Sequence, residues 1–86
     1  MRYTILVAKP ARKFLERLTD AGQRTRFERI IDGLAMNPRP VGCQPLQGLR
    51  GAYRVRVGGF RVLYQIEDDR LLVLVTDIGS RGQIYR

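Results

Sequence analysis

Three arginines lie close together in an alternating stretch of the 86-residue chain. Arg54 and Arg56 precede a Gly58-Gly59 pair and Arg61 follows it, and such a glycine pair is typical of a two-residue hairpin turn. If the glycines form that turn, Arg56 lies opposite Arg61 and all three guanidinium groups share one face of a sheet. Guanidinium groups bind phosphate and carboxylate through paired hydrogen bonds, so the pattern points to recognition of an anion.

This arrangement of arginines has a cost for the sheet. Like charges directly opposite each other on paired strands destabilise a sheet by roughly 0.2–1 kcal/mol. No Asp or Glu occurs between Asp32 and Glu67 to offset them. The pattern therefore favours an external anion, which is RNA, DNA or an acidic peptide. The alternative is that the arginines are solvated and protect an exposed sheet face from aggregation.

The composition limits the chemistry further. Sixteen Lys and Arg against eight Asp and Glu give a net charge of +8, which favours nucleic acid, an anionic membrane or an acidic protein as partner. The chain has no histidine and one cysteine, so it has no His-based triad, usual zinc site or intramolecular disulfide. We interpret Cys43 as a passive loop thiol, because no histidine can activate it. No cofactor and no metal are expected.

The length and the N-terminus predict where the protein works. Eighty-six residues form one domain, 1–86, with no room for a second module. The first nine residues are too short and too mixed for a signal peptide, and no apolar run reaches the length of a membrane span. We therefore expect a cytoplasmic protein without a membrane partner.

The elements that must position the arginines follow from the apolar pattern. Residues 3–8 predict a strand, and two amphipathic helices follow it. The first helix has Pro10 in its first turn and ends at Ala21-Gly22, and the second ends before the Asn37–Pro40 segment. Together the helices form a hairpin that covers one face of a sheet.

Three further strands complete the predicted fold. They cover Tyr53–Val57, Phe60–Ile66 and Leu71–Ile78, and the last is apolar enough to be buried on both sides. Asp68-Asp69 supplies the turn between the second and the third. The expected fold class is α+β: an N-terminal strand, a two-helix hairpin, and an antiparallel three-to-four-stranded meander.

One long run of the sequence resembles a known family. The run from Leu49 to Tyr64 (LRGAYRVRVGGFRVLY), the apolar strand after it, Ile78–Arg81 (IGSR) and Tyr85 resemble the RelE/ParE toxin superfamily, and the match covers essentially the whole chain. The resemblance implies the RelE-like fold and a toxin of a type II toxin–antitoxin system. RelE-type members are metal-independent endoribonucleases that cut mRNA in the ribosomal A site, whereas ParE-type members inhibit DNA gyrase.

The RelE pattern also implies site residues. It has two basic residues at the positions of Arg54 and Arg56, an arginine at Arg61, another at Arg81 and a tyrosine at Tyr85, and this chain fills all five positions. By this resemblance Arg56 and Arg61 clamp the phosphate, and Arg54 positions the RNA backbone. Arg81 sits at the leaving oxygen, which it stabilises or protonates, and Tyr85 stacks on a base or orients it. The ribose 2′-OH attacks the adjacent phosphate, which leaves a 2′,3′-cyclic phosphate and a 5′-hydroxyl.

The chain departs from the RelE pattern in three ways. The best-known members have lysines where this chain has Arg54 and Arg56, and many relatives have histidine or lysine where Ser80 stands. The chain ends at Arg86, before the C-terminal helix of some relatives. Because arginine stays protonated, the general base has no assignment, and catalysis is expected to depend on positioning and electrostatics within the ribosome.

The resemblance implies partners and leaves two alternatives open. The implied partners are a RelB-like antitoxin and the ribosome with its mRNA. One alternative is a ParE-like toxin that inhibits DNA gyrase. The other is a non-catalytic RNA-binding module or an inactivated toxin.

Overall fold

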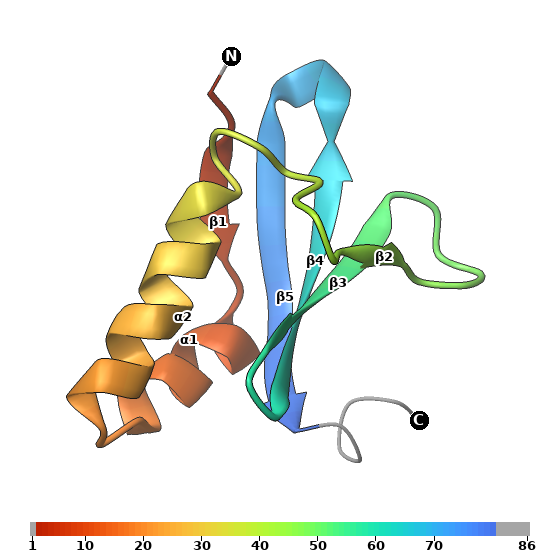
Figure 1. The fold of residues 1–86 in the computed structure, drawn as a ribbon. Coiled ribbons are helices and arrows are strands. Elements are labelled where there is room, and N and C mark those ends of the chain that lie inside the picture. The colour runs from red at the N-terminus through yellow and green to blue at the C-terminus, as the bar shows by residue number, and fades with distance from the viewer. Residues whose placement is uncertain (1, 81–86) are drawn as a thin grey trace.

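The structure is a computed structural model, and it describes residues 2–80. Arg81 and Tyr85, two of the five predicted site residues, lie outside the described residues. The predicted α+β class is confirmed (Figure 1). In chain order the elements are β1 (Thr4–Val7), α1 (Lys9–Arg17), α2 (Ala21–Gly33), β2 (Gln44–Pro45), β3 (Ala52–Val57), β4 (Phe60–Glu67), the 3-10 helix η1 (Asp68–Arg70) and β5 (Leu72–Ser80).

The sheet combines the predicted N-terminal strand with an antiparallel meander of four strands, within the predicted three to four. It has five strands in the order β1-β5-β4-β3-β2. β1 pairs with β5 in parallel, and every other neighbouring pair is antiparallel. The parallel pairing is possible because the two helices form the long connection that returns the chain to the same edge. The additional strand β2 consists of two residues in the segment expected to be a loop.

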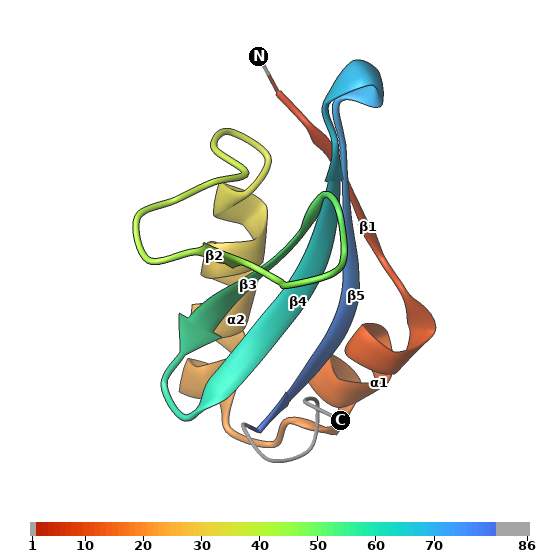
Figure 2. The ribbon, with the colours of Figure 1, turned by 90° about the vertical axis from the view of Figure 1, so that its right-hand side faces the viewer.

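Both helices cover the same face of the sheet, as predicted (Figure 1). In Figure 2 the other face, which we call the open face, is turned to the viewer and the helices lie behind it. Phe14 of α1, Phe27 of α2 and Phe60 of β4 meet edge to face, with ring centroids 5.3–5.7 Å apart. Neither α1 nor α2 is long and apolar enough to cross a membrane.

The boundary between the helices differs from the prediction. α1 ends at Arg17, and Ala21-Gly22 form the first turn of α2 rather than the end of α1. Asp20 is the reason, because its side chain accepts a hydrogen bond from the Gln23 backbone N–H at 3.0 Å and so caps α2. The capping carboxylate has more influence on this boundary than the glycine.

β5 is covered on one side rather than on two. Val73 and Val75 are fully buried against the helices. Leu72 and Leu74 point to the open face and are only half-buried. The long apolar run therefore belongs to an interior strand, paired with β1 on one side and β4 on the other.

Candidate nucleic-acid interface

The open face of β3 and β4 carries Arg54, Arg56 and Arg61, which we call the arginine face. Arg56 pairs directly with Arg61, and Arg54 pairs with Leu63, so the predicted register is confirmed. Gly58 starts the turn with a φ of 62°, which a residue with a side chain rarely adopts. The hairpin of β3 and β4 (Figure 2) therefore places Arg56 and Arg61 directly opposite each other on neighbouring strands.

The two facing arginines differ in burial. Arg61 is 6% exposed, whereas Arg56 is exposed. On the other side of Arg61, the β5 residue in register is Gly79, which has no side chain to fill the space. A hollow of about 180 Å³ lies at this end of the hairpin, and its lining is Arg56, Gly58, Gly59, Phe60 and Arg61. It is several times larger than the roughly 30 Å³ that one water molecule occupies, so a small anion fits.

Arg54 is oriented by the edge strand β2. Gln44 of β2 is in register with Arg54, and the Arg54 guanidinium donates a hydrogen bond to the Gln44 side-chain oxygen. This contact directs Arg54 toward the outer edge of the sheet. Arg54 is therefore placed to meet a chain that runs across β2 and β3, while Arg56 and Arg61 form a separate pair.

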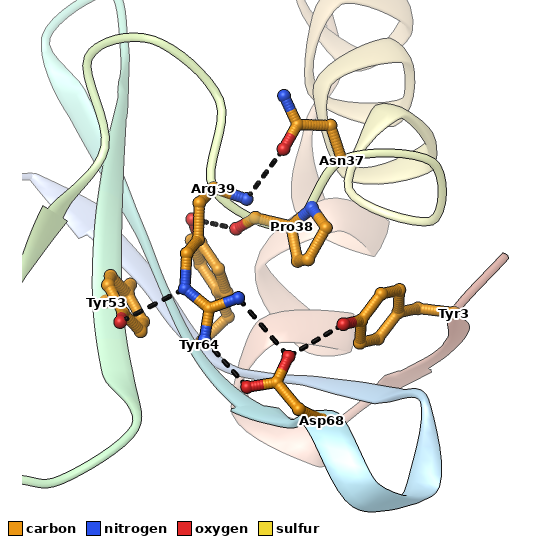
Figure 3. A network of polar contacts seen from close by, with 7 residues as sticks. All are labelled: Tyr3, Asn37, Pro38, Arg39, Tyr53, Tyr64 and Asp68. Carbon is orange, nitrogen blue, oxygen red and sulfur yellow. Dashed lines mark hydrogen bonds and ion pairs between the residues drawn. The ribbon is translucent and has the colours of Figure 1, made fainter. Parts of the chain in front are cut away.

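A network of polar contacts around a single arginine, which we call the Arg39 network, lies outside the arginine face (Figure 3). The Arg39 guanidinium donates to both carboxylate oxygens of Asp68, at 3.2 and 2.9 Å, and to the Tyr53 hydroxyl at 3.2 Å. The Tyr3 hydroxyl donates to the same carboxylate at 2.7 Å. The network joins the segment before β1, the loop after α2, β3 and the turn after β4.

The charges of the Arg39 network neutralise each other. Hydrogen bonds from Arg39 and then from Tyr3 hold the pKa of Asp68 below its ordinary value. The hydrogen bonds to Asp68 also raise the pKa of Arg39. The hydrogen bond that Tyr3 makes to the same carboxylate raises the pKa of Tyr3. Because Asp68 already balances its charge, Arg39 has a structural role and is a poor candidate for binding an external anion.

A buried tyrosine holds the loop that carries Arg39. Tyr64 is fully buried, and its hydroxyl donates to the Pro38 carbonyl at 2.9 Å (Figure 3). Burial raises the pKa of Tyr64, so the hydroxyl stays protonated and keeps donating. The Asn37 side chain accepts from the Arg39 backbone N–H at 3.1 Å. The loop is therefore fixed from both sides.

The described residues hold no metal-binding cluster. Within residues 2–80 no three side chains of His, Cys, Asp or Glu gather as ligands for an ion. Cys43 is half-buried and packs against the core. Among the described residues, the charged groups on the open face of β3, β4 and β5 are the arginines, Glu67, which pairs with Arg70, and one further carboxylate.

That carboxylate is Asp77, which sequence reasoning missed. Asp77 of β5 is in register with Leu63, so it shares the open face with Arg54 and Arg61. The signal in the sequence was weak: Thr76 and Asp77 interrupt the apolar run between Val75 and Ile78. The structure thus brings together three of the five predicted site residues and adds an acidic one.

The sequence comparisons agree with this geometry. The family model described as the ParE toxin of the type II toxin–antitoxin system parDE matches residues 5–85. The toxin RelG of Mycobacterium tuberculosis is 30% identical over 86 residues, which cover 100% of this chain and 99% of the relative. The toxin RelE of the same organism is 29% identical over 84 residues, which cover 98% of this chain and 87% of the relative.

Solved structures share the fold. A chain of the archaeal RelE–RelB complex from Pyrococcus horikoshii superposes with a TM-score of 0.83 at 26% identity, over 96% of this chain and 99% of that one. A chain of the Mycobacterium tuberculosis toxin–antitoxin complex RelBE2 gives 0.78 at 26% identity, over 96% and 95%. The chain therefore belongs to the RelE/ParE superfamily of toxins from type II toxin–antitoxin systems.

Proposed function

We propose that this toxin is an endoribonuclease that cuts mRNA in the ribosomal A site through attack of a ribose 2′-OH on the adjacent phosphate. The observation that carries the proposal is the direct pairing of Arg56 with Arg61 beside a small open hollow. Two like charges in register weaken the sheet, and a phosphate between them removes that repulsion. The same two groups stabilise the negative charge that develops on the phosphate in the transition state.

Each predicted site residue has a role in this reaction. Arg56 and Arg61 clamp the phosphate, and Arg54 at the β2 edge positions the backbone of the neighbouring nucleotide. We assign Arg81 to the leaving 5′ oxygen and Tyr85 to stacking on a base, as the family pattern implies. Both residues lie outside the described part of the chain, so these two roles rest on the resemblance alone.

The proposal includes the ribosome as a positioning device. Small arginine-based sites supply electrostatic stabilisation, but they do not by themselves hold a flexible RNA in line for attack. The ribosome holds the mRNA in a fixed geometry, and the arginine face adds the charge. Purified toxin is therefore expected to cut ribosome-bound mRNA and to leave naked mRNA nearly intact.

A RelB-like antitoxin and a cytoplasmic location belong to the same proposal. Two of the structural relatives are chains from complexes of a Rel toxin with its antitoxin. This chain carries a net charge of +8, which suits an acidic segment of a partner that covers the arginine face. Because the proposed substrate is mRNA bound to cytoplasmic ribosomes, the toxin is expected to act in the cytoplasm.

The proposal is tested by controlled expression in bacteria. We would induce the wild type, Arg61→Ala and Arg29→Ala, and map the 5′ ends of all mRNAs. Arg29 is the matched control, because it is an exposed arginine on α2, behind the sheet. Wild type and Arg29→Ala are expected to arrest growth and to create 5′-hydroxyl ends inside codons. Arg61→Ala is expected to do neither.

A second candidate function is inhibition of DNA gyrase, because the matching family model carries the ParE name. In the same experiment this function would produce a DNA-damage response without new mRNA ends, and that result would overturn the nuclease proposal. An arrest without either signal, with Arg61→Ala as toxic as the wild type, would point to a non-catalytic RNA-binding module.

A further inference from the structure

β5 contains an extra residue opposite the middle of β4. Val75 pairs with Tyr64 and Asp77 pairs with Leu63, so Thr76 has no partner position on β4. The Thr76 hydroxyl donates to the Leu63 carbonyl at 3.1 Å and fixes this β-bulge. In regular alternation Asp77 would share the face of Val75, which is fully buried. The bulge instead turns Asp77 to the open face and places Ile78 in the core.

The bulge sets Asp77 beside the arginine face. Leu63 pairs with Arg54 on one side and with Asp77 on the other, so the Cα atoms of Arg54 and Asp77 are two strand spacings, about 10 Å, apart. Arg61 is the diagonal neighbour of Asp77 on β4, at a Cα separation of roughly 7–8 Å. A nucleotide whose phosphate lies at Arg56 and Arg61 therefore has a carboxylate within reach of its ribose.

The Asp77 carboxylate is held in one orientation. Its Oδ1 accepts a hydrogen bond from the Ile78 backbone N–H at 2.8 Å, and the residue is partly exposed. Within residues 2–80 the ion pairs are Arg39–Asp68 and Arg70–Glu67, so Asp77 belongs to neither. Oδ1 is used inside the fold, and no hydrogen bond within residues 2–80 engages Oδ2.

The surroundings of Asp77 are basic on both sides of the sheet. On the open face the charged neighbours are Arg61 of β4 and, across Leu63, Arg54 and Arg56 of β3. On the opposite face α1 packs against β5, and Lys13 and Arg17 line the pocket that Ile78 also lines.

We infer that Asp77 is the general base of the RNA cleavage proposed above, and this inference rests on that proposed function. Asp77 Oδ2 takes the proton of the 2′-OH while the O2′–P bond forms. The P–O5′ bond breaks, the RNA keeps a 2′,3′-cyclic phosphate, and the leaving 5′ oxygen takes a proton from water. The arginines cannot accept the 2′ proton, because guanidinium groups stay protonated. A positioned carboxylate performs that transfer.

A competing role for Asp77 is that of a counter-ion for Arg61. A counter-ion lowers the repulsion among the arginines, so its loss changes stability and RNA affinity. A general base acts on the chemical step, so its loss changes the maximal rate. The two roles therefore separate in a concentration series.

The test is single-turnover cleavage of mRNA on programmed ribosomes at increasing toxin concentration. Asp77→Asn keeps the shape and an oxygen for the Ile78 N–H but cannot take a proton. We expect its maximal rate to fall by about 100-fold or more. The half-saturating concentration and the melting temperature are expected to stay at their wild-type values. Asp77→Glu, which restores a carboxylate, is expected to recover part of the rate.

A matched control and a modified substrate sharpen the test. Asp69→Asn makes the same charge change in the exposed η1 turn, and it is expected to cut like the wild type. A substrate with sulfur in place of the 5′ bridging oxygen has a leaving group that needs no proton. The Asp77→Asn defect is expected to persist on this substrate. If the defect disappears on this substrate, Asp77 acts on the leaving 5′ oxygen and not on the 2′-OH, and its assignment as general base is wrong.

The remaining outcomes distinguish this inference from the proposed function. If Asp77→Asn cuts at the wild-type rate, Asp77 is not the base, while the nuclease proposal stands. If Asp77→Asn changes only the half-saturating concentration or the melting temperature, Asp77 is a counter-ion and the inference is wrong. If the wild type itself does not cut ribosome-bound mRNA, the proposed function fails, and the assignment of a base fails with it.

Discussion

The molecule uses arginine in two contrasting ways. In the Arg39 network the guanidinium has its carboxylate partner, Asp68, inside the fold and stacks near the Tyr53 ring, with 5.3 Å from its central carbon to the ring centroid. On the arginine face the cross-strand neighbour of Arg56 is another arginine, Arg61. The first arrangement ties four segments of the chain together, whereas the second places like charges in register.

The difference shows how to separate structural from functional charge. An arginine with a carboxylate across from it is satisfied by folding and needs nothing from outside. Two arginines in register on an open sheet face repel each other, and an external anion between them lowers that repulsion. Residue type alone does not reveal this distinction, because Arg39 and Arg56 look alike in the sequence. The register of their neighbours reveals it.

The largest expected effect separates the two regions by catalysis. Arg56→Ala and Arg61→Ala each remove one charged donor from the transition state, so each is expected to slow cleavage of ribosome-bound mRNA by about 100-fold or more. Arg39→Ala removes a cation of the same kind from the Arg39 network and is expected to cut at close to the wild-type rate. Single-turnover rates at saturating toxin measure this. Equal losses of cleavage rate in all three variants would show that the arginine face and the Arg39 network do not differ in catalysis.

The next effect concerns the hydrogen bond from Tyr64 that holds the loop carrying Arg39. Tyr64→Phe removes the hydroxyl that donates to the buried Pro38 carbonyl, and an unsatisfied buried carbonyl costs about 1–3 kcal/mol. Urea denaturation is expected to show that loss in the free energy of unfolding, while cleavage by the folded protein persists. An unchanged free energy of unfolding would mean that this hydrogen bond does not hold the loop.

A smaller effect is expected to have opposite signs in the two regions. Arg39→Ala breaks an ion pair whose side chains are 43% and 52% exposed, so it is expected to lower the free energy of unfolding by no more than about 1 kcal/mol. Arg56→Ala removes a like-charge pair and is expected to raise that free energy by a few tenths of a kcal/mol. Chemical denaturation of both variants measures the two changes. A clear loss of stability in Arg56→Ala would show that the arginine face is needed for folding.

The smallest effect is the pH dependence of the Arg39 network. Folding lowers the pKa of Asp68, so the unfolded chain binds a proton there at higher pH than the folded one. The carboxylate therefore adds stability above the ordinary aspartate pKa of about 3.9, and that stability is lost as the pH falls through the folded value. The melting temperature of the wild type is expected to exceed that of Asp68→Asn at neutral pH and to approach it in acid. A gap that stays constant with pH would contradict this.

The arginine face could be predicted because its information is local. Gly58-Gly59 and the alternation around them determine the turn, and the turn determines which residues pair. The same reasoning predicted the two helices, since their apolar residues recur at helical spacing. The end of the first helix was missed because a glycine was given more weight than the Asp20 cap.

The remaining features depend on contacts between distant residues. Arg39 and Asp68 are 29 positions apart, and nothing in either neighbourhood marks them as partners. β2 is a strand only because Gln44 and Pro45 meet β3 across a turn. The bulge at Thr76 changes the face of Asp77, and a single extra residue within an apolar run gives a weak signal. Such features follow from the assembled sheet rather than from any one segment.

The central claim is that Arg56 and Arg61 together hold an RNA phosphate. It is tested most directly by titrating a short 2′-O-methyl RNA, which cannot be cut, into the wild type, Arg56→Ala and Arg39→Ala at several salt concentrations. The account predicts that the wild type and Arg39→Ala bind alike. It also predicts that Arg56→Ala binds more weakly, with a shallower dependence of affinity on salt because one phosphate contact is lost. Equal binding and equal salt dependence in all three proteins would contradict it.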